Sequence, residues 1–172
     1  MGFRSLLGVI VLLFSLSAQA QESALSPELR SLPSEITFTH QGFTSQERTQ
    51  LTNEMFVLYE RVAGCRYLTQ YRPDLQRDVL NYIRSSQLHF VKDSSTSQYE
   101  CGHTYTLYPV FVINRIYLTS NAFDFGCNVL WSTLFHEIIH LQRPQYSENR
   151  VHALESKCVS QYAYRGFRPP SP

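Results

Sequence analysis

The apolar positions between residues 44 and 84 recur every three or four residues, which is the period of an amphipathic helix. Thr44 and Glu47 have the spacing of a capping box, so a first helix is predicted from Thr44 to about Gly64. Pro73 suits the first position of a second helix. The apolar faces of these two helices are expected to consist of Leu51, Met55, Leu58, Tyr59 and Val62, and of Leu75, Val79, Leu80 and Ile83.

Three segments favour extended structure. Residues 35–40 alternate between polar and apolar side chains, residues 87–92 can form a short strand, and residues 105–118 are rich in Tyr, Val, Phe and Ile. The last segment predicts one strand or two, with a break near Pro109 or Asn114. The mixed order of helices and strands predicts a single α+β domain with an antiparallel or mixed sheet.

Two further helices are predicted near the end of the chain. Asn128 can cap a helix that ends at about Gln142, because the residue before Pro144 is disfavoured in helical geometry. Ser147 can cap a final helix that reaches about Tyr164.

The first twenty residues have the pattern of a secretory signal sequence. Arg4 precedes a short apolar core, residues 6–14, and the small residues Ala18 and Ala20 follow it. We expect cleavage before Gln21, although an uncleaved membrane anchor is the alternative reading of the same pattern. The protein is therefore expected to be secreted or periplasmic.

The mature chain is expected to have a loosely held polar lead-in at residues 21–35, a domain at 36–166 and a tail at 167–172. Without Arg4, the chain's 15 basic side chains become 14 and equal its 14 acidic ones. This balance gives no reason to expect nucleic acid or, after signal cleavage, a membrane as a partner. The oligomeric state is left open.

The even number of cysteines in an exported chain predicts two disulfides. Three pairings are compatible with the sequence, and a four-cysteine metal site is disfavoured because no CxxC pair occurs. As a working assignment, we pair Cys127 with Cys158 and Cys65 with Cys101.

The strongest chemical signal is the segment HEIIH at residues 136–140. Residues four apart lie on one face of a helix, so His136 and His140 can both bind one zinc ion. Glu137 can reach a water bound to that ion and act as the general base. This arrangement is typical of zinc enzymes that hydrolyse peptide bonds.

Residues 113–162 resemble the active-site region of the zincin superfamily of metallopeptidases, which places an edge strand before the HExxH helix. The resemblance implies a zincin-type fold, one zinc ion and a peptide or protein substrate bound extended along residues 110–118. The metzincin branch is excluded, because its glycine and last histidine positions are Arg143 and Tyr146 here.

The gluzincin branch takes its third zinc ligand from a glutamate in the following helix, where Glu148 and Glu155 are the candidates. If Cys127 pairs with Cys158, the helices are antiparallel and the ion lies near Glu148, with Glu155 about two turns, roughly 10 Å, away. This argument favours Glu148. The other glutamate is expected to hydrogen-bond to a ligand histidine.

Several other residues have weaker claims to a role. Tyr146 can donate a hydrogen bond to the oxyanion, His152 can act as a ligand or a donor, and Arg165 can bind a substrate carboxylate. We interpret the remaining histidines as surface or strand residues, namely His40, His89 and His103.

Taken together, these patterns predict an exported zinc metallopeptidase. The alternatives are a non-catalytic exported binding or stabilising module that retains the fold, and a zinc amidase that acts on cell-wall peptides. The intact Glu137 argues against a protein that only binds, because such a protein needs no base at this position.

Overall fold

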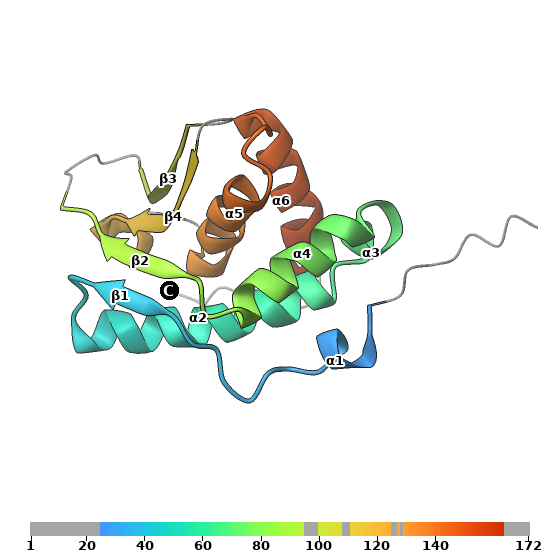
Figure 1. Cartoon of the computed structure of the whole chain (residues 1–172), viewed down its shortest axis with the longest axis horizontal. Helices are drawn as coiled ribbons and strands as arrows, with labels where there is room; N and C mark the ends of the chain where they lie inside the picture. The colour runs from blue at the N-terminus through green and yellow to red at the C-terminus, as the bar shows by residue number, and fades with distance from the viewer. Residues whose placement is uncertain (1–24, 95–99, 108–110, 125–126, 128, 164–172) are drawn as a thin grey trace, which may run out of the picture.

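The computed structural model describes residues 25–163, apart from 95–99, 108–110, 125–126 and 128 (Figure 1). The predicted signal sequence and tail lie outside the described residues, as does Arg165. No helix in the described ranges is long and apolar enough to cross a membrane. The elements in chain order are α1 (Pro27–Arg30), β1 (Thr39–Gln41), α2 (Ser45–Ala63), α3 (Arg66–Tyr71), α4 (Pro73–Arg84), β2 (His89–Lys92), β3 (Gly102–Leu107), β4 (Phe111–Leu118), the 3-10 turn η1 (Ser120–Ala122), α5 (Leu130–Gln142) and α6 (Glu148–Ala163).

The four strands form one mixed sheet in the order β1-β2-β4-β3. β2 pairs in parallel with both β1 and β4, whereas β3 pairs antiparallel with β4. Figure 1 shows this sheet on one side of the molecule, with α5 next to β3 and β4 and with α6 packed against α5. The predicted α+β class and mixed sheet are therefore confirmed.

The identity of the edge strand differs from the prediction. Residues 110–118 were expected at the sheet edge, but β4 lies inside the sheet, between β2 and β3. The chain turns back after β3, and β4 pairs with β2 on its other side, which leaves β3 at the edge. β3 also packs against α5, so any extended substrate beside α5 would meet β3.

Local sequence rules account well for α2 and α4. Thr44 and Glu47 form the predicted capping box, with the Glu47 backbone N–H donating to Thr44 Oγ1 over 3.2 Å and the Thr44 N–H donating to Glu47 Oε2 over 2.8 Å. The helix ends at its C-cap, Gly64, and α4 begins at Pro73. Gln76 of α4 is fully buried, and its Nε2 donates to the Val62 carbonyl over 2.8 Å, so it satisfies the C-terminal end of α2.

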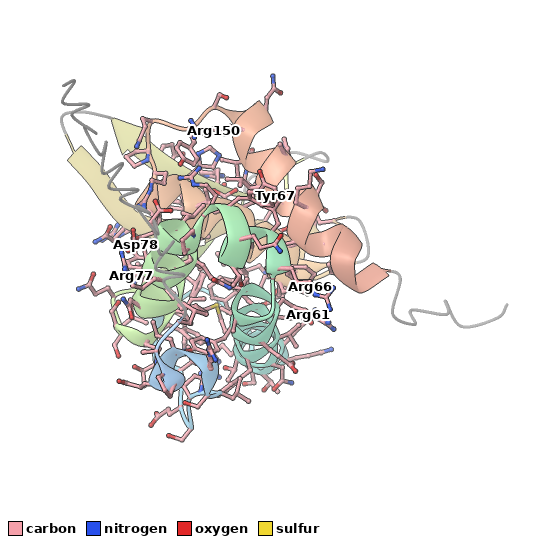
Figure 2. The ribbon with its side chains drawn as sticks, turned by 90° about the vertical axis from the view of Figure 1, so that its right-hand side faces the viewer. Arg61, Arg66, Tyr67, Arg77, Asp78 and Arg150 are labelled. Carbon is pink, nitrogen blue, oxygen red and sulfur yellow. A yellow bond between two sulfur atoms is a disulfide. The ribbon has the colours of Figure 1, made fainter. Side chains whose placement is uncertain are left out.

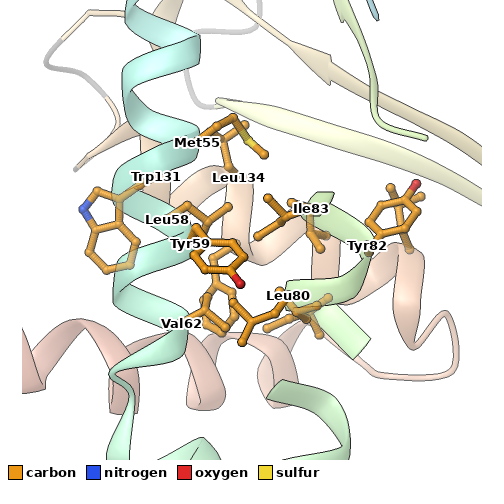
Figure 3. Close-up of a cluster of buried hydrophobic side chains, with 14 of the residues drawn as sticks. Met55, Leu58, Tyr59, Val62, Leu80, Tyr82, Ile83, Trp131 and Leu134 are labelled. Atoms are coloured by element: carbon orange, nitrogen blue, oxygen red, sulfur yellow. The ribbon is translucent and has the colours of Figure 1, made fainter. Parts of the chain in front are cut away.

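The core lies where α2 crosses α4 and α5 (Figure 3). Each large apolar side chain buried there contributes about 1.5–3 kcal/mol relative to exposure. These contacts fix one side of α5 against the rest of the domain and leave its histidine-bearing side toward α6. The labelled residues of this cluster are Met55, Leu58, Tyr59, Val62, Leu80, Tyr82, Ile83, Trp131 and Leu134.

The described part of the lead-in is ordered against the domain, contrary to the expectation of a loose segment. Leu25 and Leu29 of this segment are buried in the core, and α1 was not predicted. The Tyr59 hydroxyl donates to the Leu29 carbonyl over 3.1 Å. The sparse apolar residues of this segment have no periodicity, so a local pattern could not reveal their long-range packing.

The N-terminus of α5 is also satisfied differently from the prediction. Its N-cap residue is Val129 rather than Asn128, and Val129 provides no side-chain cap. Instead, the half-buried carboxylate of Glu54 on α2 accepts a hydrogen bond from the Trp131 backbone. This contact gives the N-terminus of α5 an acceptor on α2 and helps to fix the two helices relative to one another.

The chain forms two disulfides, as predicted, but the predicted pairing is wrong. Cys65 bonds to Cys158, and Cys101 bonds to Cys127. α6 packs against α3, which brings Cys158 to the start of α3 at Cys65. The second bond ties the residue before β3 to the segment that leads into α5. The pairing thus follows from helix packing across 93 residues, which sequence spacing does not reveal.

Candidate metal centre

α5 presents its two histidines from a helix that is buried on most of its surface. His136 and His140 are four residues apart and lie on the same face, with ring centroids 4.9 Å apart. β3 and α6 both pack against this helix, so neither imidazole projects freely into solvent. The sequence prediction that one helix presents both rings together is confirmed.

Glu148, the first residue of α6, faces both histidines. Its Oε2 lies 3.0 Å from Nε2 of His136, and its Oε1 lies 3.1 Å from Nε2 of His140. The short turn between α5 and α6 makes this possible, with the Tyr146 N–H donating to the Arg143 carbonyl over 2.9 Å. One carboxylate therefore spans the two nitrogens that face the same space.

Glu155 lies about two turns further along α6 than Glu148 and contacts the other ring nitrogen of His136. Its Oε2 is 3.3 Å from Nδ1 of His136 and 3.3 Å from Nδ1 of His152. Its Oε1 accepts a hydrogen bond from the Ser132 hydroxyl. Glu155 is thus placed to orient His136 and to fix which ring nitrogen carries the proton.

The charges of the site shift the pKa values of its carboxylates and imidazoles. Burial works to lower the pKa of His136, but the Glu155 hydrogen bond and the charges of Glu137 and Glu148 outweigh it and raise that pKa. For His140, burial prevails and lowers the pKa. Burial works to raise the pKa of Glu148, but the two histidines outweigh it, so this carboxyl is favoured as the anion.

Glu137 is only 5% exposed and lies beside the two histidines. Burial raises the pKa of Glu137 to about 7, while the charge of His136 and a hydrogen bond with the Thr104 side chain oppose that shift. A carboxyl whose pKa is near neutrality can both take and return a proton at physiological pH. The predicted base therefore lies in an environment that suits proton transfer.

The donor set fits zinc. Nε2 of His140 is buried and makes no hydrogen bond with a described residue, although Glu148 Oε1 is only 3.1 Å away. The ligand atoms of His136, His140 and Glu148 all lie within 4.8 Å of one another. Two imidazole nitrogens and one carboxylate oxygen are a common catalytic zinc set, with a fourth position left for water or substrate.

A second group of possible ligands uses the other face of His136. His136, His152 and Glu155 also have ligand atoms within 4.8 Å of one another. In this group the His136 ligand atom would be Nδ1, which is the nitrogen that faces Glu155. The group includes His136 but not His140, the second histidine of α5. Glu155 is also engaged by the Ser132 hydroxyl, whereas Glu148 makes its polar contacts with the two histidines of α5, so the first group is the stronger candidate for a metal centre.

The edge strand β3 contributes residues that the sequence analysis did not assign to the site. A cavity of about 260 Å³ beside the centre is lined by Thr104, His103 and Gly102 together with Glu100 and the α5 histidines. The Thr104 side chain hydrogen-bonds with Glu137, whereas His103 stacks on Tyr117 with ring centroids 5.0 Å apart. The sequence held one signal for this placement: Gly102 follows Cys101, and the Cys101–Cys127 disulfide brings this segment close to the start of α5. That signal could be used only if the disulfide pairing was already known.

Other predicted residues lie elsewhere. Tyr146 was considered as an oxyanion donor, but it is buried and its hydroxyl accepts a hydrogen bond from Arg72. The Arg150 guanidinium covers its ring at 3.8 Å, so Tyr146 supports the α5–α6 turn and does not line the cavity beside the histidines. His40 and His89 lie in strands β1 and β2, away from α5, in agreement with their interpretation as strand residues.

Comparison of the chain with protein-family models, with curated proteins and with solved structures finds no match. The residues of this site and their geometry are therefore what indicates a function.

Proposed function

We propose that the protein is an exported zinc metallopeptidase of the gluzincin type, with one zinc ion held by His136, His140 and Glu148. The observation that carries this proposal is the convergence of both Glu148 oxygens on Nε2 of the two histidines, at 3.0 and 3.1 Å. A buried glutamate, Glu137, adjoins the same pair. The mixed sheet, with an edge strand beside the HExxH helix, supports a zincin-type fold.

Zinc held by His136, His140 and Glu148 would lower the pKa of a bound water toward about 7 and polarise the substrate carbonyl. Glu137 would accept a proton from the attacking water and then deliver it to the leaving amine. Without a bound cation, burial raises the pKa of Glu137 to about 7, and a zinc ion beside it would favour the carboxylate form that accepts the proton. Thr104 holds the carboxyl of Glu137 in place.

The substrate is an extended peptide or protein segment that pairs with the exposed edge of β3. A strand at a sheet edge has unpaired backbone groups, which a peptide can satisfy by adding one more strand. β3 lies at the edge and packs on α5, so a peptide paired with it passes over Glu137 and the histidines. Nothing in the geometry requires nucleic acid or a second protein chain.

Export is the third part of the proposal. The pattern of residues 1–20 and the two disulfides both favour an oxidising compartment. N-terminal sequencing of the protein recovered from outside the cytoplasm is expected to begin at Gln21. Recovery of full-length protein in the membrane fraction would contradict this part and would support an uncleaved anchor.

The enzyme proposal is tested by zinc content and by cleavage of an unfolded protein substrate. We expect about one zinc per chain and metal-dependent cleavage, and we expect Glu137→Gln to abolish cleavage while it retains zinc. Glu60→Gln, an exposed change on α2, is the matched control and is expected to behave like the parent protein. Zinc binding without cleavage of proteins or of cell-wall peptides would refute the enzyme proposal and favour a binding module. Cleavage of cell-wall peptides alone would favour an amidase.

A further inference from the structure

The cavity at the metal centre continues into a groove along α5. A second cavity, of about 250 Å³, shares Glu100, Gly102, His136 and Glu137 with the first one. A third cavity shares Ser132, His152 and Glu155 with the second. The three cavities are therefore adjacent parts of one groove between β3, α5 and α6.

The length of this groove suits a chain rather than a small molecule. From His136 to Val129, which lines the third cavity, α5 advances seven residues, or about 10 Å at 1.5 Å per residue. An extended peptide covers that distance with about three residues. The second cavity, which Glu137 also lines, is large enough for a long side chain, since a cavity of roughly 150 Å³ already holds benzene.

The groove next to the metal centre is acidic. Four carboxylates line its first two cavities, those of Glu100, Glu137, Glu148 and Glu155. In the part of the chain that the structure describes, no lysine or arginine lines either cavity. Figure 2 shows four of the chain's arginines on its helical side instead, namely Arg61, Arg66, Arg77 and Arg150.

Glu100 is the carboxylate of the second cavity that remains accessible to a ligand. Glu155 is engaged by Ser132, His136 and His152. The Glu100 side chain, in contrast, is 44% exposed and lies 3.3 Å from Nδ1 of His103. The Glu100 backbone is firmly placed, because its carbonyl accepts a hydrogen bond from the Thr119 hydroxyl over 2.6 Å. The next residue, Cys101, is held by its disulfide.

We propose that this groove selects peptides with a lysine or arginine side chain next to the cleaved bond, and that Glu100 supplies the opposing charge. This inference rests on the proposed peptidase function and adds its substrate class. The long basic side chain enters the second cavity, its methylene groups pack along the Cys101–Cys127 disulfide and Gly102, and its charged end reaches Glu100. An acidic side chain at the same position is repelled by the carboxylates around it.

The test uses zinc-loaded protein and a series of otherwise uncharged peptides. Lys, Arg, Gln, Met or Glu is placed in turn at each position flanking the cleaved bond, and kcat/KM is measured. At one of the two flanking positions, we expect Lys and Arg to exceed Gln by about tenfold and Glu to be the poorest residue. Glu100→Gln is expected to reduce the Lys-to-Gln ratio by about fivefold, which is the effect of one partly exposed charge. Glu100→Lys is expected to invert the preference, and Glu60→Gln is expected to leave the ratio unchanged.

A binding measurement separates this inference from the catalytic proposal. Fluorescently labelled forms of the Lys and Gln peptides are titrated with the zinc-loaded Glu137→Gln protein, with and without Glu100→Gln, and the dissociation constants are compared. Tighter binding of the Lys peptide, lost on Glu100→Gln, supports the inference even if the parent protein cleaves nothing. Equal binding of the two peptides, or a Lys preference that Glu100→Gln does not alter, overturns it.

Discussion

Replacing Glu155 by glutamine separates its role from that of Glu148. The change keeps the shape of the side chain and an oxygen that can accept from Ser132, but it removes the negative charge 3.3 Å from Nδ1 of His136. If Glu155 orients a ligand histidine, zinc binding must weaken without being lost. If it is itself a ligand, zinc binding must fall as far as it does when Glu148 is replaced.

The expected magnitude follows from the position of the carboxylate. Loss of a partner that orients a metal-bound histidine usually lowers metal affinity by about 10- to 100-fold, or about 1.4–2.7 kcal/mol. The Glu155 side chain is only 16% exposed, so water screens its charge weakly and the effect is expected in the upper half of that range. Glu148→Gln removes a ligand from the ion itself and is expected to weaken zinc binding by more than 100-fold.

Competition against a zinc-chelating dye at constant pH and ionic strength gives the three dissociation constants. Glu60→Gln serves as the control for a lost surface charge, and circular dichroism checks that each variant is folded. The reasoning would be refuted if Glu155→Gln lost more affinity than Glu148→Gln. Such a result, together with a similar loss in His152→Ala, would place the ion in the second group of ligands, on Nδ1 of His136.

Three further predictions concern stability. Replacing both Cys65 and Cys158 by serine is expected to lower the free energy of unfolding by about 4.6 kcal/mol, because the disulfide closes a loop of 93 residues in the unfolded chain. Urea denaturation measures this loss, and a value under about 1 kcal/mol would contradict the pairing. Gln76→Leu is expected to cost about 1–3 kcal/mol in the same assay. The change removes the side-chain donor from the Val62 and Ala63 carbonyls, of which the Val62 carbonyl keeps the Cys65 N–H, and an unchanged midpoint would count against that role. Burial raises the pKa of Glu54 above 4.5, so its contribution to stability is present at low pH and is lost as the pH rises through the raised value. Glu54→Gln is therefore expected to raise Tm more at about pH 7 than at about pH 4, and the opposite order would contradict the sign.

The sequence predicted the parts of this fold that depend on neighbouring residues. The capping box at Thr44 and Glu47, the helix end at Gly64 and the helix start at Pro73 all follow from rules that act within one helical turn. The same holds for the two imidazoles of α5, whose spacing of four residues fixes their common face. These features need no knowledge of the rest of the fold.

Features that depend on distant packing were not predicted. Cys158 reaches Cys65 only because α6 packs against α3, and β3 becomes the edge only because β4 pairs with β2. Glu148 and Glu155 are seven residues apart, so they lie on nearly the same face of α6, and this spacing gave no basis for choosing between them. The preference for Glu148 used a Cys127–Cys158 bond that does not form.

Glu148 nevertheless faces both histidines, for a different reason. α6 begins at Glu148, directly after a short turn, so its first turn lies beside the last turn of α5, which carries His140. Glu155 reaches instead the turn of α5 that carries Ser132 and His136. The two roles follow from where the turn ends and not from the disulfide.

The central claim, a zinc ion held by His136, His140 and Glu148, is tested most directly by anomalous scattering at the zinc edge from crystals of the zinc-loaded protein. We predict one peak per chain, about 2.0–2.2 Å from Nε2 of His136, Nε2 of His140 and a carboxylate oxygen of Glu148. A peak on Nδ1 of His136 between His152 and Glu155, or no peak at this site at saturating zinc, would contradict the account.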